Sequence, residues 1–346
     1  MKRKPLSTLL AAAVGSCAIV LAGCGSSTPL VKSNATQSSP SSTPGSGSGS
    51  ASPSNSEPGQ PMTTLTVGYV PSTLMTALFV GEQEGFFRGE GINLVLTSND
   101  SGPALLSSVL QGSYQLAFTA LFPALLAYGK GAPIQLVAAA SLVGPGQADE
   151  AVVVRAGSAV KSLKDLTGKT VGTNALTSAV TLGVQLGVDH TGGNSHSVHF
   201  IALPFAQEIQ EVQTGQIAAA GLIEPFSNVA IGQGLRTVGN PIDAYLPAGT
   251  PYAVYLTSQT TMQRDGAAIR RFTVALRHSQ TYANAHPADV RAVEQTDLKI
   301  PSADLNGAPI PKQDSNLSRS LISQFADTML HYGYLSKVPD INRLMP

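Results

Sequence analysis

Eight side chains that could contact a small polar molecule fall in short loops that follow predicted strands. They are hydroxyls, aromatic rings and one carboxylate: Tyr69, Ser72, Thr73, Thr119, Phe122, Thr177, Ser178 and Glu224. These loops contain no Arg or Lys, and the nearest is Arg155. A polyphosphate or a dicarboxylate normally requires a guanidinium fork. The residues therefore predict a neutral, zwitterionic or singly anionic ligand, because helix N-termini can hold one negative charge unaided.

Glu224 allows two interpretations. Its carboxylate could accept a hydrogen bond from an amine on the ligand. Alternatively, Glu224-Pro225 only ends a strand and begins a helix with a carboxylate in the first turn. The sequence leaves both interpretations open.

The first loop follows a pattern that is typical of a strand, a polar turn and a helix. Leu65, Val67 and Tyr69 alternate with small or polar residues, and Pro71 then ends the strand because it has no N–H to donate. Ser72 and Thr73 can cap the helix that follows. This arrangement directs a helix N-terminus and small hydroxyls to the region beyond the strand.

The same alternation of strands and helices recurs along the chain and predicts an α/β fold with mainly parallel sheets. Further strands are expected at 91–97, 114–119, 135–141, 151–154, 170–172, 198–202, 217–223 and 250–257. Long helical patterns cover 261–286, 288–295 and 317–332. We expect two lobes of similar plan, one of residues 63–150 plus 248–346 and one of residues 151–247. A ligand cleft is expected between them.

The N-terminal segment has the features of a secretory signal peptide. A basic start at Lys2–Lys4 precedes an apolar stretch at 6–21 that is too short to span a bilayer comfortably. The stretch ends in Leu21-Ala22-Gly23-Cys24, which resembles the lipobox of bacterial lipoproteins. That resemblance implies cleavage after residue 23 and lipidation of Cys24. Residues 24–62 are rich in Ser, Pro and Gly, and we expect them to form a disordered tether.

Charge and cysteine content exclude several classes of protein. Removal of residues 1–23 leaves 18 basic and 21 acidic residues, a net charge of −3, which argues against nucleic-acid binding. Cys17 is lost with the leader and Cys24 is lipidated. The folded part would therefore have no thiol for a disulfide, a thiolate metal site or cysteine catalysis.

The sequence lacks the motifs that are diagnostic of nucleotide binding, serine hydrolysis or metal binding. Thr167–Thr170 resembles the end of a P-loop motif. That motif requires a glycine five residues before Gly168, and this position holds Leu163. The sequence contains neither a G-x-G-x-x-G motif nor a G-x-S-x-G motif. His190, His196 and His199 cluster in a glycine-rich stretch that is typical of an exposed loop, so we expect no metal. No cofactor is expected either.

The order and spacing of several segments over residues 63–346 resemble the solute-binding proteins of ABC importers in the nitrate, sulfonate and taurine class. The segments are Gly68–Pro71, Glu84–Phe87, Gly91-Ile92, Ala151–Arg155, Lys161–Val171, Gly215, Gly221–Pro225 and Gly333–Leu335. The resemblance implies a type II periplasmic-binding-protein-like fold that closes on a solute and docks on permease subunits. The chain departs from the family pattern at Gln115 and Ala218, where aspartate is common, and at Ile223, where tryptophan is common.

Taken together, these features predict a monomeric, lipid-anchored protein on the extracytoplasmic face of the cell membrane. It would deliver a small organic solute to an ABC importer and would not be an enzyme. One alternative is an enzyme on the same two-lobed fold, of the kind found in menaquinone or thiamine-pyrimidine biosynthesis. A ligand-sensing lipoprotein is a third possibility.

Overall fold

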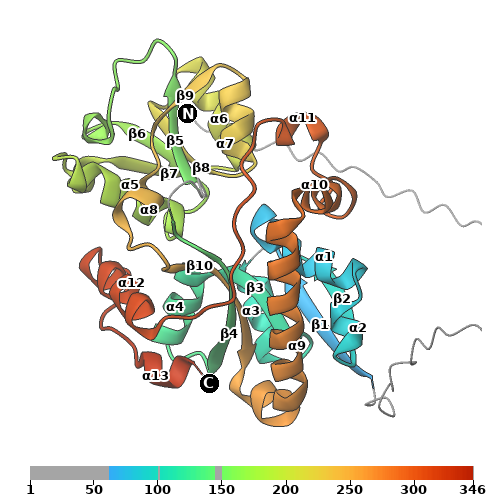
Figure 1. The fold of residues 1–346 in the computed structure, drawn as a ribbon. Coiled ribbons are helices and arrows are strands. Elements are labelled where there is room, and N and C mark those ends of the chain that lie inside the picture. Colours follow the sequence, from blue (N-terminus) through green and yellow to red (C-terminus); the bar gives the residue numbers. More distant parts are fainter. Residues whose placement is uncertain (1–61, 100–101, 145–149, 346) are drawn as a thin grey trace, which may run out of the picture. The chain divides into compact units, whose positions relative to one another are not determined.

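The computed structural model describes residues 62–99, 102–144 and 150–345, all of which belong to one compact unit that begins at Ser56. The predicted leader, Cys24 and nearly all of the predicted tether lie outside the described residues. The described chain forms two five-stranded sheets flanked by helices (Figure 1). No helix within it combines the length and the apolar character needed to cross a bilayer.

The first sheet has the strand order β2-β1-β3-β10-β4. Its strands are β1 (Thr63–Tyr69), β2 (Ile92–Ser98), β3 (Leu116–Ala120), β4 (Ile134–Leu142) and β10 (Pro251–Ser258). β1 pairs in parallel with β2 and β3, whereas β10 is antiparallel to both β3 and β4. Every residue of β10 is buried, as expected for an inner strand of a sheet covered on both faces.

The second sheet has the order β7-β6-β8-β5-β9. Its strands are β5 (Glu150–Arg155), β6 (Thr170–Thr173), β7 (His199–Ala202), β8 (Ala219–Ile223) and β9 (Leu235–Gly239). β6 is parallel to β7 and β8, and β5 is antiparallel to β8 and β9. Four of the five strands in each sheet therefore share one direction, which confirms the mainly parallel prediction.

Helices cover both faces of the first sheet. They are η1 (Thr73–Met75), α1 (Thr76–Gln83), α2 (Phe86–Gly89), α3 (Gly102–Leu110), α4 (Leu121–Gly129), α9 (Gln259–Ala285), α10 (Pro287–Thr296), α12 (Arg319–His331) and α13 (Ile341–Leu344). The short helix α11 (Ser302–Leu305) instead packs against α7 (Phe226–Gly232) beside the second sheet. The long helix α9 packs against α1 and α2, with Phe272 against Phe87 at a ring distance of 5.4 Å. Gly81 of α1 permits this packing, because a Cβ there would meet the Ser279 side chain.

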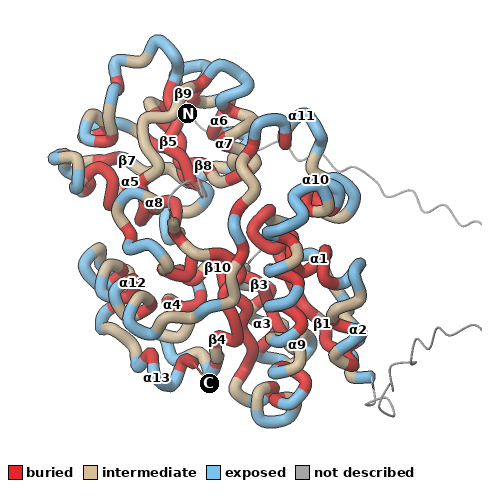
Figure 2. The backbone as a smooth tube through the Cα atoms, in the orientation of Figure 1, coloured by how far each residue is buried: buried red, intermediate tan, exposed pale blue. Residues whose placement is uncertain are grey.

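Shorter helices flank the second sheet. They are η2 (Leu163–Leu166), α5 (Ala179–His190), η3 (Ser195–Ser197), α6 (Phe205–Thr214), α7 (Phe226–Gly232) and α8 (Pro241–Tyr245). Two apolar clusters pack around this sheet, one with Val152, Val171 and Val184 and one with Val153, Ile209 and Leu222. Burial is concentrated in the strands and in the helix faces turned toward them (Figure 2).

Two glycines make equivalent turns in the two sheets. Gly112 and Gly215 both have φ of 78°, a left-handed conformation that suits glycine. Each ends a helical turn before the strand at the same position of its sheet, β3 or β8. The residue three positions later, Gln115 or Ala218, donates its N–H to Thr66 or Thr170 respectively. The two glycine turns are therefore structurally equivalent, as expected for two lobes of similar plan.

Glu208 is the most unusual buried acid in the second lobe. It lies in the first turn of α6 with its side chain beside Gly172, and it is fully buried. Neither carboxylate oxygen has a hydrogen-bond partner among the described residues. Desolvation raises the pKa of Glu208 to about 8, so the carboxyl group is protonated at neutral pH.

We expect Glu208→Gln to make stability less dependent on pH. The folded-state pKa lies above the unfolded value, so the wild type loses stability as pH rises from 4.5 to about 8. The loss has an upper limit of about 5 kcal/mol. Urea unfolding should show equal stability of variant and wild type at pH 4.5 and a more stable variant at pH 8. Glu211→Gln on the same helix is the control, and parallel pH profiles for wild type and Glu208→Gln would contradict the prediction.

Candidate functional site

A pocket of 440 Å³ has walls from both sheets. Its lining from the first sheet and its helices comprises Val70, Pro71, Ser72, Leu74, Phe118, Thr119, Ala120, Pro123, Tyr252 and Ala253. The second sheet and its helices contribute Asn174, Ala175, Thr177, Ser178, Ala179, Val180, Phe205 and Ile223. None of these lining residues carries a charge. Most of the wall is apolar, and a few hydroxyls and one amide supply its polar groups.

The pocket lies where strands end and helices begin. β3 leads into α4, β6 into α5 and β7 into α6, and residues at all three junctions line it. Ala120, the N-cap of α4, has no side chain that can accept from the first turn. The N–H groups of Leu121 and Phe122 at this helix start therefore receive no side-chain cap, Pro123 has no N–H, and the helix dipole favours negative charge at this end.

Four of the predicted site residues line this pocket: Ser72, Thr119, Thr177 and Ser178. The two serines already have structural roles. Ser72 Oγ accepts from the N–H of Leu74 at 3.2 Å, and Ser178 Oγ accepts from the N–H of Thr181 at 3.2 Å. Ser178 also donates to the carbonyl of Ala175 at 2.9 Å. These hydroxyls fix the two loops that form opposite walls of the pocket.

Three polar side chains in the wall have no such partner. The side chains of Thr119, Asn174 and Thr177 make no hydrogen bond to other residues in the described part of the chain. Asn174 and Thr177 are exposed, and Thr119 is half-buried. They come from both lobes, so a ligand between them could bond to each lobe.

Three other predicted residues do not line the pocket. Tyr69 packs edge-on against Phe79 at 5.4 Å and borders a separate hollow with Asp297. Thr73 is buried, and its hydroxyl has no partner among the described residues. Phe122 is fully buried against the ring of Tyr334 at 4.9 Å. In this structure their side chains belong to the packing that supports the pocket.

Glu224 also lies outside the lining, although its neighbour Ile223 belongs to it. The carboxylate is nearly buried and accepts from the N–H of Asn228 at 3.4 Å. Burial raises the pKa of Glu224, while the Ser227 hydroxyl, the Asn228 amide and Arg291 oppose the shift. Glu224 precedes Pro225, the N-cap of α7, so its carboxylate lies just before the first helical turn and not in it. Its bond from the Asn228 N–H is local to this helix start, and a role in binding the solute stays a prediction.

The sequence interpretation missed Asn174, Phe205 and Tyr252 as lining residues. Asn174 shares a loop with Thr177 and could have been included on that ground. Tyr252 was missed because β10 was predicted without a direction. The strand is reversed, with Ala253 opposite Ala120, so its first residues lie at the ends of its neighbours.

Hydrogen bonds and apolar contacts also join the lobes outside the pocket. The hydroxyls of Tyr332 and Tyr334 donate to Asp189 at 2.9 Å and to Gln185 at 2.8 Å. On α7, Asn228 Nδ2 donates to the carbonyls of Asp304 at 2.9 Å and Asn306 at 3.0 Å. Leu182 and Leu186 of α5, together with Ala179, belong to the core cluster of the first lobe.

No group of three His, Cys, Asp or Glu side chains in the described residues could hold a metal ion. His190 instead stacks on Tyr245 at 4.6 Å, and its Nδ1 lies 2.9 Å from the carbonyl of Leu186. Asp189 accepts from the N–H and hydroxyl of Ser195. These contacts account for the positions of Asp189 and His190 without a ligand.

The fold is that of the two-lobed periplasmic binding proteins. The alkanesulfonate-binding protein of Xanthomonas axonopodis pv. citri, solved with MOPS bound, matches with a TM-score of 0.69 at 18% identity, over 83% of this chain and 99% of that one. The aliphatic sulphonate-binding protein of Escherichia coli matches with a TM-score of 0.68 at 19% identity, over 81% and 91%. The nitrate-binding protein of Synechocystis PCC 6803 matches with a TM-score of 0.67 at 16% identity, over 82% of this chain and 86% of that one.

The family model described as NMT1/THI5 like matches residues 72–290. This match covers more than half of the chain, and the protein therefore belongs to that family. No curated protein sequence gives a significant match. The predicted two-lobed fold is confirmed, and so is the resemblance to solute-binding proteins at the level of fold and family.

Ser178 provides a test of how the pocket wall is held. Loss of its capping hydroxyl in Ser178→Ala should lower the free energy of unfolding by about 1 kcal/mol. Ser178→Asp keeps a capping oxygen and should recover most of that loss. Urea unfolding of the three proteins is the measurement. Equal stability of Ser178→Ala and wild type would show that the cap does not stabilise α5.

Proposed function

We propose that this protein is a solute-binding component of an ABC importer that closes on a small organic solute without changing it. The solute is neutral, zwitterionic or singly anionic and belongs to the class of sulfonates, taurine and nitrate. The site consists of the pocket between the lobes, with Thr119, Asn174 and Thr177 as direct donors or acceptors. Ser72 and Ser178 hold the loops that carry these contacts.

One observation carries the proposal: walls from both lobes present polar side chains that have no hydrogen-bond partner among the described residues. A ligand that bonds to both lobes stabilises the closed arrangement over an open one, because an open arrangement provides only part of the contacts. A permease can then distinguish the loaded protein from the empty one by its shape. No acid–base pair or nucleophile lies in the described lining, which favours binding over catalysis.

The chemistry of the wall supports the class of solute. A second negative charge on the ligand would lack a cationic partner among the described lining residues. One negative charge could be held by the N–H groups at the start of α4. The similar structures are named for the binding of sulfonates and of nitrate, which are singly charged anions.

The lipobox-like end of the leader supports a membrane location for the protein. Cys24 with its diacylglyceryl group would anchor the chain on the extracytoplasmic face. The Ser-, Pro- and Gly-rich stretch that follows would let the binding domain reach the permease subunits.

We expect Thr177→Val to weaken binding of the cognate solute. Valine keeps the shape of threonine but removes the hydroxyl, and one lost hydrogen bond should reduce affinity about 5- to 20-fold. A thermal-shift screen of the full-length protein against sulfonates, taurine, nitrate, pyrimidines and aromatic acids would first identify a ligand. Calorimetry would then compare wild type and variant.

Thr281→Val on the exposed side of α9 is the matched control and should bind as wild type does. Ser178→Asp should reject a singly anionic solute by charge repulsion and still bind a neutral one. Wild-type affinity in both Thr177→Val and Ser72→Ala would remove the site assignment. Release of a chemically altered product from the bound solute would favour an enzyme.

Lipidation of Cys24 is tested by substitution of each cysteine in turn. Cys24→Ser should abolish incorporation of labelled palmitate and move the protein out of the membrane fraction. Cys17→Ser alters only the leader and should leave both unchanged. Labelling of the Cys24→Ser protein at the wild-type level would contradict the proposed anchor.

A further inference from the structure

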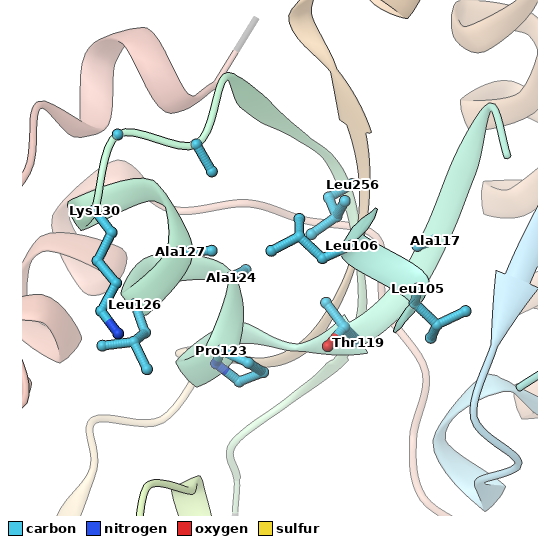
Figure 3. Close-up of a pocket in the computed structure, with 12 residues that line it drawn as sticks. Leu105, Leu106, Ala117, Thr119, Pro123, Ala124, Leu126, Ala127, Lys130 and Leu256 are labelled. Atoms are coloured by element: carbon cyan, nitrogen blue, oxygen red, sulfur yellow. The ribbon is translucent and has the colours of Figure 1, made fainter. Parts of the chain in front are cut away.

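A second cavity lies within the first lobe, between α3 and α4 and against β3 and β10 (Figure 3). Its volume is 570 Å³. Leucine, alanine and proline side chains form most of its wall, including Leu105, Leu106, Ala127 and Leu256. Among its described lining residues, only Thr119 and Lys130 carry polar side-chain atoms. Lys130 is exposed at the end of α4, so its ammonium group stays hydrated at the rim.

This apolar cavity adjoins the pocket between the lobes. Thr119 and Pro123 line both spaces. Thr119 lies near the end of β3, and Pro123 lies in the first turn of α4, where Figure 3 shows the two side chains close to each other. The two spaces therefore adjoin at Thr119 and Pro123.

The two spaces complement each other chemically. The pocket between the lobes provides the helix N-termini and the unpaired side chains that a polar head requires. The cavity in the first lobe provides a surface that water hydrates poorly, and a hydrocarbon group there gains contacts that water does not make. Its volume lies in the usual range for sites that bind small molecules.

We propose that the cavity between α3 and α4 holds an alkyl chain or ring of the same solute whose polar head lies between the lobes. The inference rests on the proposed function and narrows it. The solute class is then an amphiphilic organic molecule, and a small inorganic anion such as nitrate would leave the apolar cavity unfilled.

A chain-length series tests this inference. Calorimetry on the full-length protein in lipid nanodiscs, with empty nanodiscs as the blank, would compare the 1-alkanesulfonates from ethane- to octanesulfonate and the matching primary alcohols. Affinity should rise about fourfold for each added methylene until the cavity is full. Ala127→Phe places a ring in the cavity at a position that does not line the pocket between the lobes. It should abolish this rise and leave ethanesulfonate affinity unchanged.

Ala267→Phe on the exposed side of α9 is the matched control and should keep the rise. Leu106→Ala enlarges the cavity and should extend the rise to longer chains, which keeps the test decisive if Ala127→Phe does not fold. If no sulfonate binds, the proposed head group is wrong, and the alcohol series still decides the inference. If affinity rises with chain length in either series and Ala127→Phe abolishes that rise, the inference about the cavity is supported. Affinities independent of chain length, or a rise that Ala127→Phe leaves intact, would overturn it.

Discussion

The placement of one reversed strand inside each sheet is the constraint on which the structure depends. β10 enters the first sheet between β3 and β4, and β5 enters the second sheet between β8 and β9. Both are antiparallel to their neighbours. Each also follows a strand of the other sheet along the chain, β5 after β4 and β10 after β9, so the chain crosses between the sheets before each of them. These crossings link the two sheets through the backbone, and the pocket lies between the sheets that they connect.

The reversal also determines which residues reach the pocket. The parallel strands bring their final residues and the helix starts that follow, such as Ala120 and Ser178. The reversed strand brings its first residues, such as Tyr252.

Polar groups at this edge divide into two kinds. The hydroxyls of Ser72 and Ser178 are used to hold the backbone, whereas Thr119, Asn174 and Thr177 remain unpaired within the described chain. Hydrogen bonds that already hold these loops favour tight binding, because the loops lose little conformational entropy when the solute binds.

Much of this could be predicted from local sequence patterns. Alternating apolar residues located the strands, and capping chemistry correctly placed Ser72 at a helix start. Periodicity does not encode strand direction, however, because side chains alternate in the same way in parallel and antiparallel strands. The strand at β10 could be predicted, but its direction could not, and so neither could the place of Tyr252 in the pocket wall. Burial also could not be predicted, because Phe122 lies three residues after Thr119 at the same strand-to-helix junction but packs in the core.

The position of β10 also sets the order in which the sheets can form during synthesis. The second sheet is built from one continuous segment, residues 150–239, and all its strands exist once Gly239 has been made. The first sheet lacks an inner strand until Ser258 has been added, although its other four strands come earlier. In a chain that stops short of β10, the edges of β3 and β4 that pair with this strand stay open, and open edges invite pairing with other chains. The C-terminal half of the protein thus completes the fold of the N-terminal half and pairs with strand edges that would otherwise stay open.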